Sequence, residues 1–74
     1  MVIIRNIANP FKTEDAQVRE FKYSRSKCVR DYLDESGFDY QGKRVIVTGK
    51  RIEDLSVRID NGDEIVVVPE VKAP

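Results

Sequence analysis

The sequence predicts an α+β domain in which a mixed sheet of four to five strands packs on one face against a single helix. Short β-branched segments lie near both ends of the chain, and one amphipathic stretch lies between them. Because one helix covers only one face of a sheet, we expect two layers rather than three. The 74 residues are enough for one domain, which we place at 1–74.

The first two predicted elements are strands that form a hairpin. Residues 2–7 are rich in β-branched side chains, and Asn9 and Pro10 end this strand. Residues 8–16 contain turn formers and charges, which indicates a loop. Residues 18–23 alternate between polar and apolar side chains, as in a second strand.

A helix over 25–36 is predicted because the spacing of apolar residues changes there from the alternation of a strand to the stripe of a helix. Its apolar positions fall on one stripe: Cys28, Val29, Tyr32 and Leu33. Ser24 or Ser26 can supply the N-cap oxygen, and Gly37 is placed for a left-handed C-terminal cap.

Further strands are predicted after the helix. Residues 43–48 form a strand, and 49–50 form a tight turn into a short segment. Residues 55–59 indicate a short edge strand or an extended stretch, and 60–63 indicate a turn. Residues 65–68 form the last strand. The first and last strands are the most apolar, so we expect them to be parallel and central.

This order of elements is that of the β-grasp, or ubiquitin-like, fold. Residues 45–51 (Val-Ile-Val-Thr-Gly-Lys-Arg) and 59–71 (Ile-Asp-Asn-Gly-Asp-Glu-Ile-Val-Val-Val-Pro-Glu-Val) resemble the C-terminal half of the sulfur carriers of thiamine and molybdopterin biosynthesis. The resemblance implies a protein substrate whose diglycine end is adenylated and thiocarboxylated. Residues 72–74, Lys-Ala-Pro, stand in place of that end, so we rank this function second.

A second resemblance covers the front of the chain. Residues 4–11 read Ile-Arg-Asn-Ile-Ala-Asn-Pro-Phe and are similar to the ubiquitin-like domains of bacteriophage tail-assembly and tail-tip proteins. Those domains also have an Asn-Gly-type turn and a Gly-Asp-type turn before the last strand. The resemblance implies a small phage-related protein whose partners are other tail components.

The composition excludes several kinds of site. The chain has no His and a single Cys, so it cannot supply Ser-His-Asp or Cys-His catalysis, an internal disulfide or a Cys/His zinc site. We interpret Cys28 as a small hydrophobic residue of the helix and 60–64 as a turn rather than a calcium loop. We therefore expect no enzyme activity, cofactor, metal or small-molecule substrate.

The charge and hydropathy patterns limit the partners. No apolar run approaches the ~20 residues of a membrane span, so we expect no membrane contact. We expect the protein to be cytoplasmic or assembled into a phage particle. Lys and Arg total 13, as do Asp and Glu, and this neutrality ranks nucleic-acid binding third.

Two features predict a surface that binds protein. Basic residues gather at 19–30 and 43–51, whereas acidic residues dominate 53–70. The helix leaves one face of the apolar central strands uncovered, and such a face marks a contact surface. The predicted partner-binding residues are Arg19, Lys22, Arg25, Lys27, Arg30, Ile3, Val66 and Val68. We predict a non-catalytic interaction module that binds a phage structural or assembly protein, or a second copy of itself.

The charges around the helix are ordered against its dipole. Basic residues stand at its predicted N-terminus and acidic residues at its C-terminus. Lys27–Asp31 and Arg30–Asp34 are predicted as i,i+4 pairs. Departures from such local charge preferences are found most often at functional sites, so this order of charges favours a polar docking surface.

Overall fold

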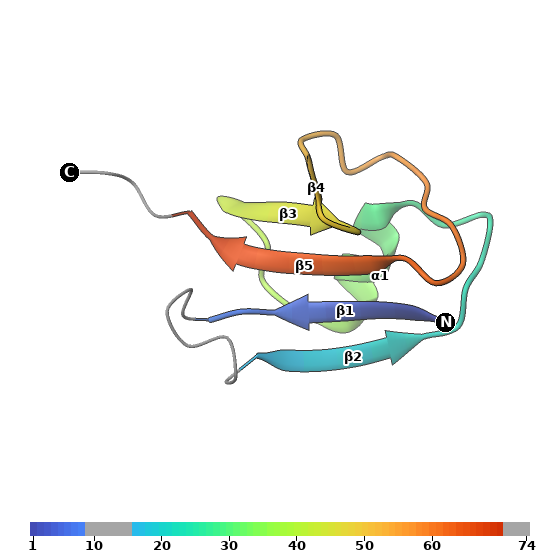
Figure 1. The fold of residues 1–74 in the computed structure, drawn as a ribbon, viewed down its shortest axis with the longest axis horizontal. Helices are drawn as coiled ribbons and strands as arrows, with labels where there is room; N and C mark the ends of the chain where they lie inside the picture. Colours follow the sequence, from blue (N-terminus) through green and yellow to red (C-terminus); the bar gives the residue numbers. More distant parts are fainter. Residues whose placement is uncertain (9–15, 71–74) are drawn as a thin grey trace.

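The protein is an α+β domain with one mixed five-stranded sheet and one helix, as the sequence predicts (Figure 1). The computed structural model describes residues 1–8 and 16–70. The elements are β1 (Val2–Asn6), β2 (Gln17–Phe21), α1 (Val29–Ser36), β3 (Lys43–Val47), β4 (Lys50–Ile52) and β5 (Glu64–Pro69). The predicted stop at Asn9-Pro10, the rest of the 8–16 loop up to residue 15, and residues 71–74 lie outside the described residues. Nowhere in 1–8 and 16–70 is there a helix long and apolar enough to cross a membrane.

The parallel pair of β1 and β5 forms the centre of the sheet, which confirms the predicted position of the first and last strands. The strand order is β2-β1-β5-β3-β4, and the other three pairings are antiparallel. Ile4 pairs with Ile65 across the parallel ladder. Both residues are fully buried because α1 packs behind this part of the sheet in Figure 1.

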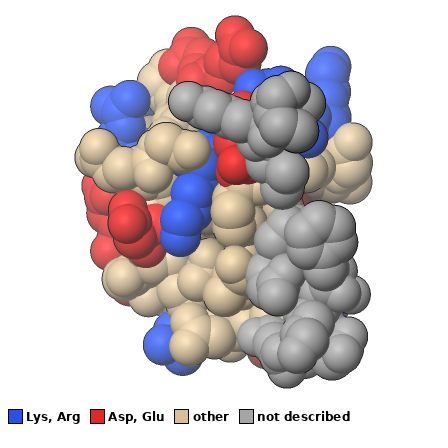
Figure 2. All heavy atoms as spheres, turned by 90° about the vertical axis from the view of Figure 1, so that its left-hand side faces the viewer, with Lys and Arg blue, Asp and Glu red and all other residues tan. Residues whose placement is uncertain are grey.

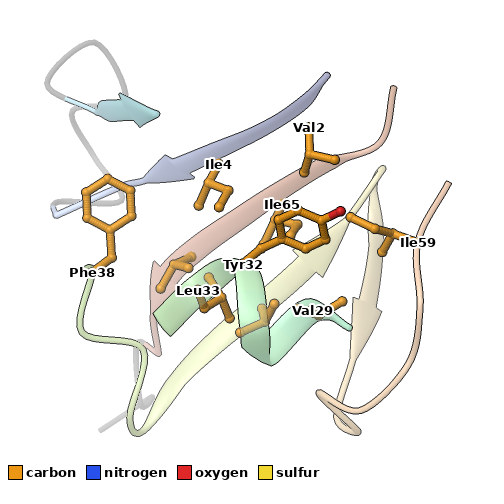
Figure 3. Close-up of a cluster of buried hydrophobic side chains, with 10 residues drawn as sticks. Val2, Ile4, Val29, Tyr32, Leu33, Phe38, Ile59 and Ile65 are labelled. Atoms are coloured by element: carbon orange, nitrogen blue, oxygen red, sulfur yellow. The ribbon is translucent and has the colours of Figure 1, made fainter. Parts of the chain in front are cut away.

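The core lies between α1 and one face of the sheet. Val29, Tyr32 and Leu33 project from the helix toward the strands (Figure 3). The buried side chains opposite and around them come mainly from the central strands and the segments that flank the helix: Val2, Ile4, Phe38, Val45, Ile59, Ile65 and Val67. Three of the four predicted stripe positions therefore belong to the core, and alternate residues of β1 and β5 supply four more of its side chains.

Tyr32 fixes the position of the helix with its hydroxyl group as well as its ring. The side chain is fully buried. Its Oη accepts a hydrogen bond from the backbone N–H of Ser24 at 2.8 Å and donates one to the carbonyl oxygen of Ser24 at 3.1 Å. One hydroxyl thus satisfies both backbone groups of a residue in the connection between β2 and α1.

The helix begins at Val29, four residues later than predicted. Ser24 and Ser26 do not cap it, because the backbone of Ser24 bonds to Tyr32 and the two serine hydroxyl groups bond to each other at 2.9 Å. Cys28 is the N-cap residue instead. Gly37 ends the helix with φ 78°, as predicted, and its missing Cβ makes this left-handed conformation accessible.

Residues 53–63 form no regular strand, so the alternative of an edge strand at 55–59 is wrong. The carbonyl oxygens of Val57 and Leu55 accept hydrogen bonds from the first helical N–H groups, those of Val29 and Arg30, at 3.0 and 2.9 Å. Helix N-termini leave such groups without partners inside the helix. This segment is irregular, with a turn at residues 55–56 and a single antiparallel bridge between Arg58 and Cys28, and its backbone contacts the start of α1 rather than the sheet.

The turn between β3 and β4 is one residue earlier than predicted. Thr48 and Gly49 occupy it with φ values of 47° and 82°, the conformation of a two-residue hairpin turn, and Lys50 already belongs to β4. Positive φ is unfavourable for Thr. Its Oγ1 donates to Asp63 Oδ1 at 2.9 Å, and its N–H donates to the carbonyl oxygen of Glu64 at 2.8 Å, which holds the turn against β5.

Replacement of the Tyr32 hydroxyl should destabilise the fold. Tyr32→Phe leaves the backbone N–H of Ser24 without its partner, while the carbonyl oxygen keeps only the N–H of Lys27 at 3.2 Å. We therefore expect a loss of about 1–3 kcal/mol in the free energy of unfolding measured in urea. Tyr40→Phe is the matched control, because the hydroxyl of Tyr40 donates to Asp34 at an exposed site and should contribute less than about 1 kcal/mol. Equal losses in the two variants would contradict this role of Tyr32.

Candidate functional site

The sheet face opposite α1, the open face, is the strongest candidate for a functional surface. Alternate residues of every strand point to it because side chains in a strand alternate between faces. Its described residues are Ile3, Arg5, Val18, Glu20, Arg44, Ile46, Arg51, Glu64, Val66 and Val68. No described helix covers this face, which is turned toward the viewer in Figure 1.

One row of side chains crosses the open face from edge to edge. Neighbouring strands place its members side by side in the order Val18, Arg5, Val66, Ile46 and Arg51. Val66 and Ile46 lie directly opposite each other, in the middle of the row, and both are half-buried. Val18 is 46% exposed at the edge of the sheet. The row is thus an apolar strip with an arginine near each end.

Ion pairs neutralise both of these arginines. Arg5 Nε lies 2.6 Å from Glu64 Oε1, and an Arg51 guanidinium nitrogen lies 2.8 Å from Glu70 Oε1. Such exposed pairs contribute about 0–1 kcal/mol to stability. Figure 2 views the molecule from the end of β5, and basic and acidic residues are mixed on that surface. The arginines of the row therefore leave little net charge on the open face, and its apolar side chains are its main distinguishing feature.

The structure separates the predicted partner-binding residues into two groups. Ile3, Val66 and Val68 lie together on the open face and are half-buried there. Arg19 lies on the other face of β2, with its guanidinium 5.3 Å from the centre of the Phe38 ring. Arg30 is on the helix and exposed. The apolar and the basic residues therefore do not form one continuous site.

Lys27 pairs with a different acidic residue than predicted. Its Nζ contacts both carboxylate oxygens of Glu35 at 2.7–2.8 Å and lies 5.6 Å from the centre of the Tyr32 ring. The hydrogen bond to Glu35 raises the pKa of Lys27 above its usual value. The expected i,i+4 pair with Asp31 is wrong because Lys27 precedes the helix. Lys22 and Arg25 are exposed in the same connection.

Sequence reasoning missed Val18 and Ile46 as surface residues. Both lie in segments predicted as strands, so the sequence shows which of their neighbours share a face of the same strand. What was missing was the register, since only the pairing of Arg5 with Val18 and of Val66 with Ile46 shows that they extend one strip.

Cys28 is part of the helix cap and not of the apolar stripe. Its N–H donates to Asp31 Oδ2 at 3.0 Å, and its thiol donates to the same oxygen at 3.4 Å. These two hydrogen bonds lower the pKa of Asp31 because they favour the carboxylate form. The residue thus has a structural role in starting α1.

A hollow of about 380 Å³ lies at the β4 edge of the sheet. Its apolar side chains are Tyr40, Val45, Ile52 and Leu55. Lys43, Arg44 and Arg51 stand around them, with Glu53 as the one acidic residue among the described lining residues. Tyr40 is held by a 2.6 Å hydrogen bond from its hydroxyl to Asp34 Oδ1, which raises the pKa of Tyr40.

Within residues 1–8 and 16–70, no three Cys, Asp or Glu side chains come together in a way that could hold a metal ion. The chain matches no protein-family model and no curated protein.

The contact between Cys28 and Asp31 should make the stability depend on pH in acid. Since the pKa of Asp31 is lowered from 3.8 in the folded protein, its contribution is present above that value and is lost as the pH falls through the lowered pKa. The difference in unfolding free energy between wild type and Asp31→Ala should therefore shrink between about pH 5 and pH 2. Asp31→Asn, which keeps an acceptor oxygen that cannot ionise, is the control. If the unfolding free energies of wild type and Asp31→Ala fall by the same amount as the pH decreases, Asp31 does not stabilise the helix through this cap.

Proposed function

We propose that the protein is a non-catalytic protein-interaction module that docks its partner on the open face. The carrying observation is the strip from Val18 to Arg51, in which half-buried Val66 and Ile46 lie side by side and Val18, 46% exposed, lies on the other side of Arg5. Exposed apolar side chains that are contiguous, and rimmed by charged residues, are typical of contact surfaces.

The described fold supports a β-grasp assignment within this proposal. The strand order β2-β1-β5-β3-β4, with a parallel central pair and one helix after the first hairpin, is the order expected of ubiquitin-like domains. The finer proposal, a small phage or prophage protein that acts in tail assembly, rests on the resemblance of residues 4–11 and of the Asn-Gly-Asp turn before β5. Its partner would then be another tail component or a second copy.

The contacts give less support to nucleic-acid binding. Arg51 and Lys27, two of the cations available for it, are paired with Glu70 and Glu35. A phosphate backbone would have to displace these carboxylates. The sulfur-carrier alternative is supported by the same strand order, and no other contact among the described residues favours it.

Exposed valines on the two sides of the molecule provide a matched test. Val18 belongs to the strip and is 46% exposed, whereas Val57 is 38% exposed in the segment that meets the start of α1. Val18→Glu places a charge in the strip and should weaken association at least about tenfold, because a carboxylate loses hydration in an apolar interface. Val57→Glu should leave association unchanged.

Sedimentation velocity up to about 1 mM protein measures association with a second copy, including weak association. Immobilised wild type and both variants measure capture of any other partner. We expect a complex with wild type and Val57→Glu that is lost with Val18→Glu. If the three proteins behave alike in both measurements, the open face is not the docking surface.

A further inference from the structure

We infer that the hollow at the β4 edge binds an extended acidic peptide segment that inserts an aliphatic side chain. This second site is distinct from the apolar strip, although Arg51 borders both. Three independent features of the edge support it: the apolar lining of the hollow, two basic side chains without an ion pair among the described residues, and the position of β4 at the edge of the described sheet.

The hollow has the size and chemistry for an aliphatic anchor. Its 380 Å³ lies within the range of about 300–1,000 Å³ found for ligand sites. Val45, Ile52 and Leu55 are buried or half-buried there and give it an apolar lining. Tyr40 is oriented by its hydrogen bond to Asp34, so its ring is a fixed part of the site.

The charge around the hollow favours an acidic ligand. Lys43 and Arg44 border it, and in the described part of the chain neither has a carboxylate at ion-pair distance. Glu53 is the opposing charge, while Arg51 is neutralised by Glu70. Two cations without an ion pair, opposed by one carboxylate, leave an excess of one positive charge beside the apolar lining, which matches a ligand carboxylate next to an apolar group.

The outer side of β4 supplies the backbone contacts of an extended chain. β4 is an edge strand among the described residues. Val47 and Lys50 flank the two-residue turn and form its hydrogen-bonded pair, so the next residue, Arg51, directs its N–H and C=O away from β3. An added strand can pair with these groups, as in other peptide complexes built on sheet edges.

The register of such a strand defines the sequence of the ligand. Arg51 projects to the open face and Ile52 to the helix side, because neighbours in a strand alternate. A ligand residue opposite Arg51 would lie beside the arginines, and its two neighbours would point into the hollow. The expected pattern is therefore an acidic residue between two aliphatic residues.

A synthetic peptide, Gly-Glu-Leu-Glu-Leu-Glu-Gly, tests this inference with the full chain. In a titration of the ¹⁵N-labelled protein we expect saturable shifts at the amides of Lys43, Arg51, Ile52 and Leu55, with a Kd of about 0.1–1 mM, as for a short flexible ligand. Leu→Ala and Glu→Lys versions of the peptide should each bind at least about tenfold more weakly.

Charge reversals in the protein provide the matched control. Lys43→Glu with Arg44→Glu should weaken peptide binding at least about tenfold, whereas Lys22→Glu with Arg25→Glu, two exposed cations in the connection after β2, should not change it. Val18→Glu should bind the peptide like wild type, which separates this site from the open-face strip. The inference fails if no shift occurs at about 2 mM peptide, if shifts map to the strip, or if both double variants bind equally.

Discussion

The structure depends on one constraint: the sheet has two faces, and the single described helix can cover only one of them. The central strands carry apolar side chains at consecutive positions, so half of them turn toward α1 and half turn away. Ile65 and Val67 are fully buried under the helix, while Val66 between them is only half-buried. The apolar strip on the open face follows directly from this arrangement.

Polar contacts at the N-terminus of α1 hold the helix in place on the sheet. Tyr32 reaches back to the backbone of Ser24, and the carbonyl oxygens of Leu55 and Val57 accept the first free N–H groups. The connection before the helix and the segment after β4 are thereby joined to the same turn of α1. An eight-residue helix has few intrahelical hydrogen bonds, so these external partners matter for its stability.

The sequence was sufficient to predict the elements whose signal is a periodic pattern of neighbouring residues. Short β-branched or alternating segments identified four of the strands, the stripe of Val29, Tyr32 and Leu33 identified the buried side of the helix, and Gly37 marked its end. Contacts between distant residues were not predictable in this way. The late start of the helix depends on Tyr32 bonding to Ser24, and the irregular segment after β4 depends on the helix N-terminus.

The same limit explains the outcome for the candidate site. Ile3, Val66 and Val68 could be assigned to one face because the parallel pair was predicted, whereas Val18 and Ile46 required the register of β2 and β3. If the strip serves binding, as we propose, it contributes little to folding, and unfolding free energies of two double variants test this most directly. Ile46 with Val66 and Val45 with Val67 are adjacent cross-strand pairs on opposite faces. Threonine at the first pair should cost less than about 1 kcal/mol and at the second more than about 3 kcal/mol, because only the second buries its hydroxyl groups; equal costs would contradict the account.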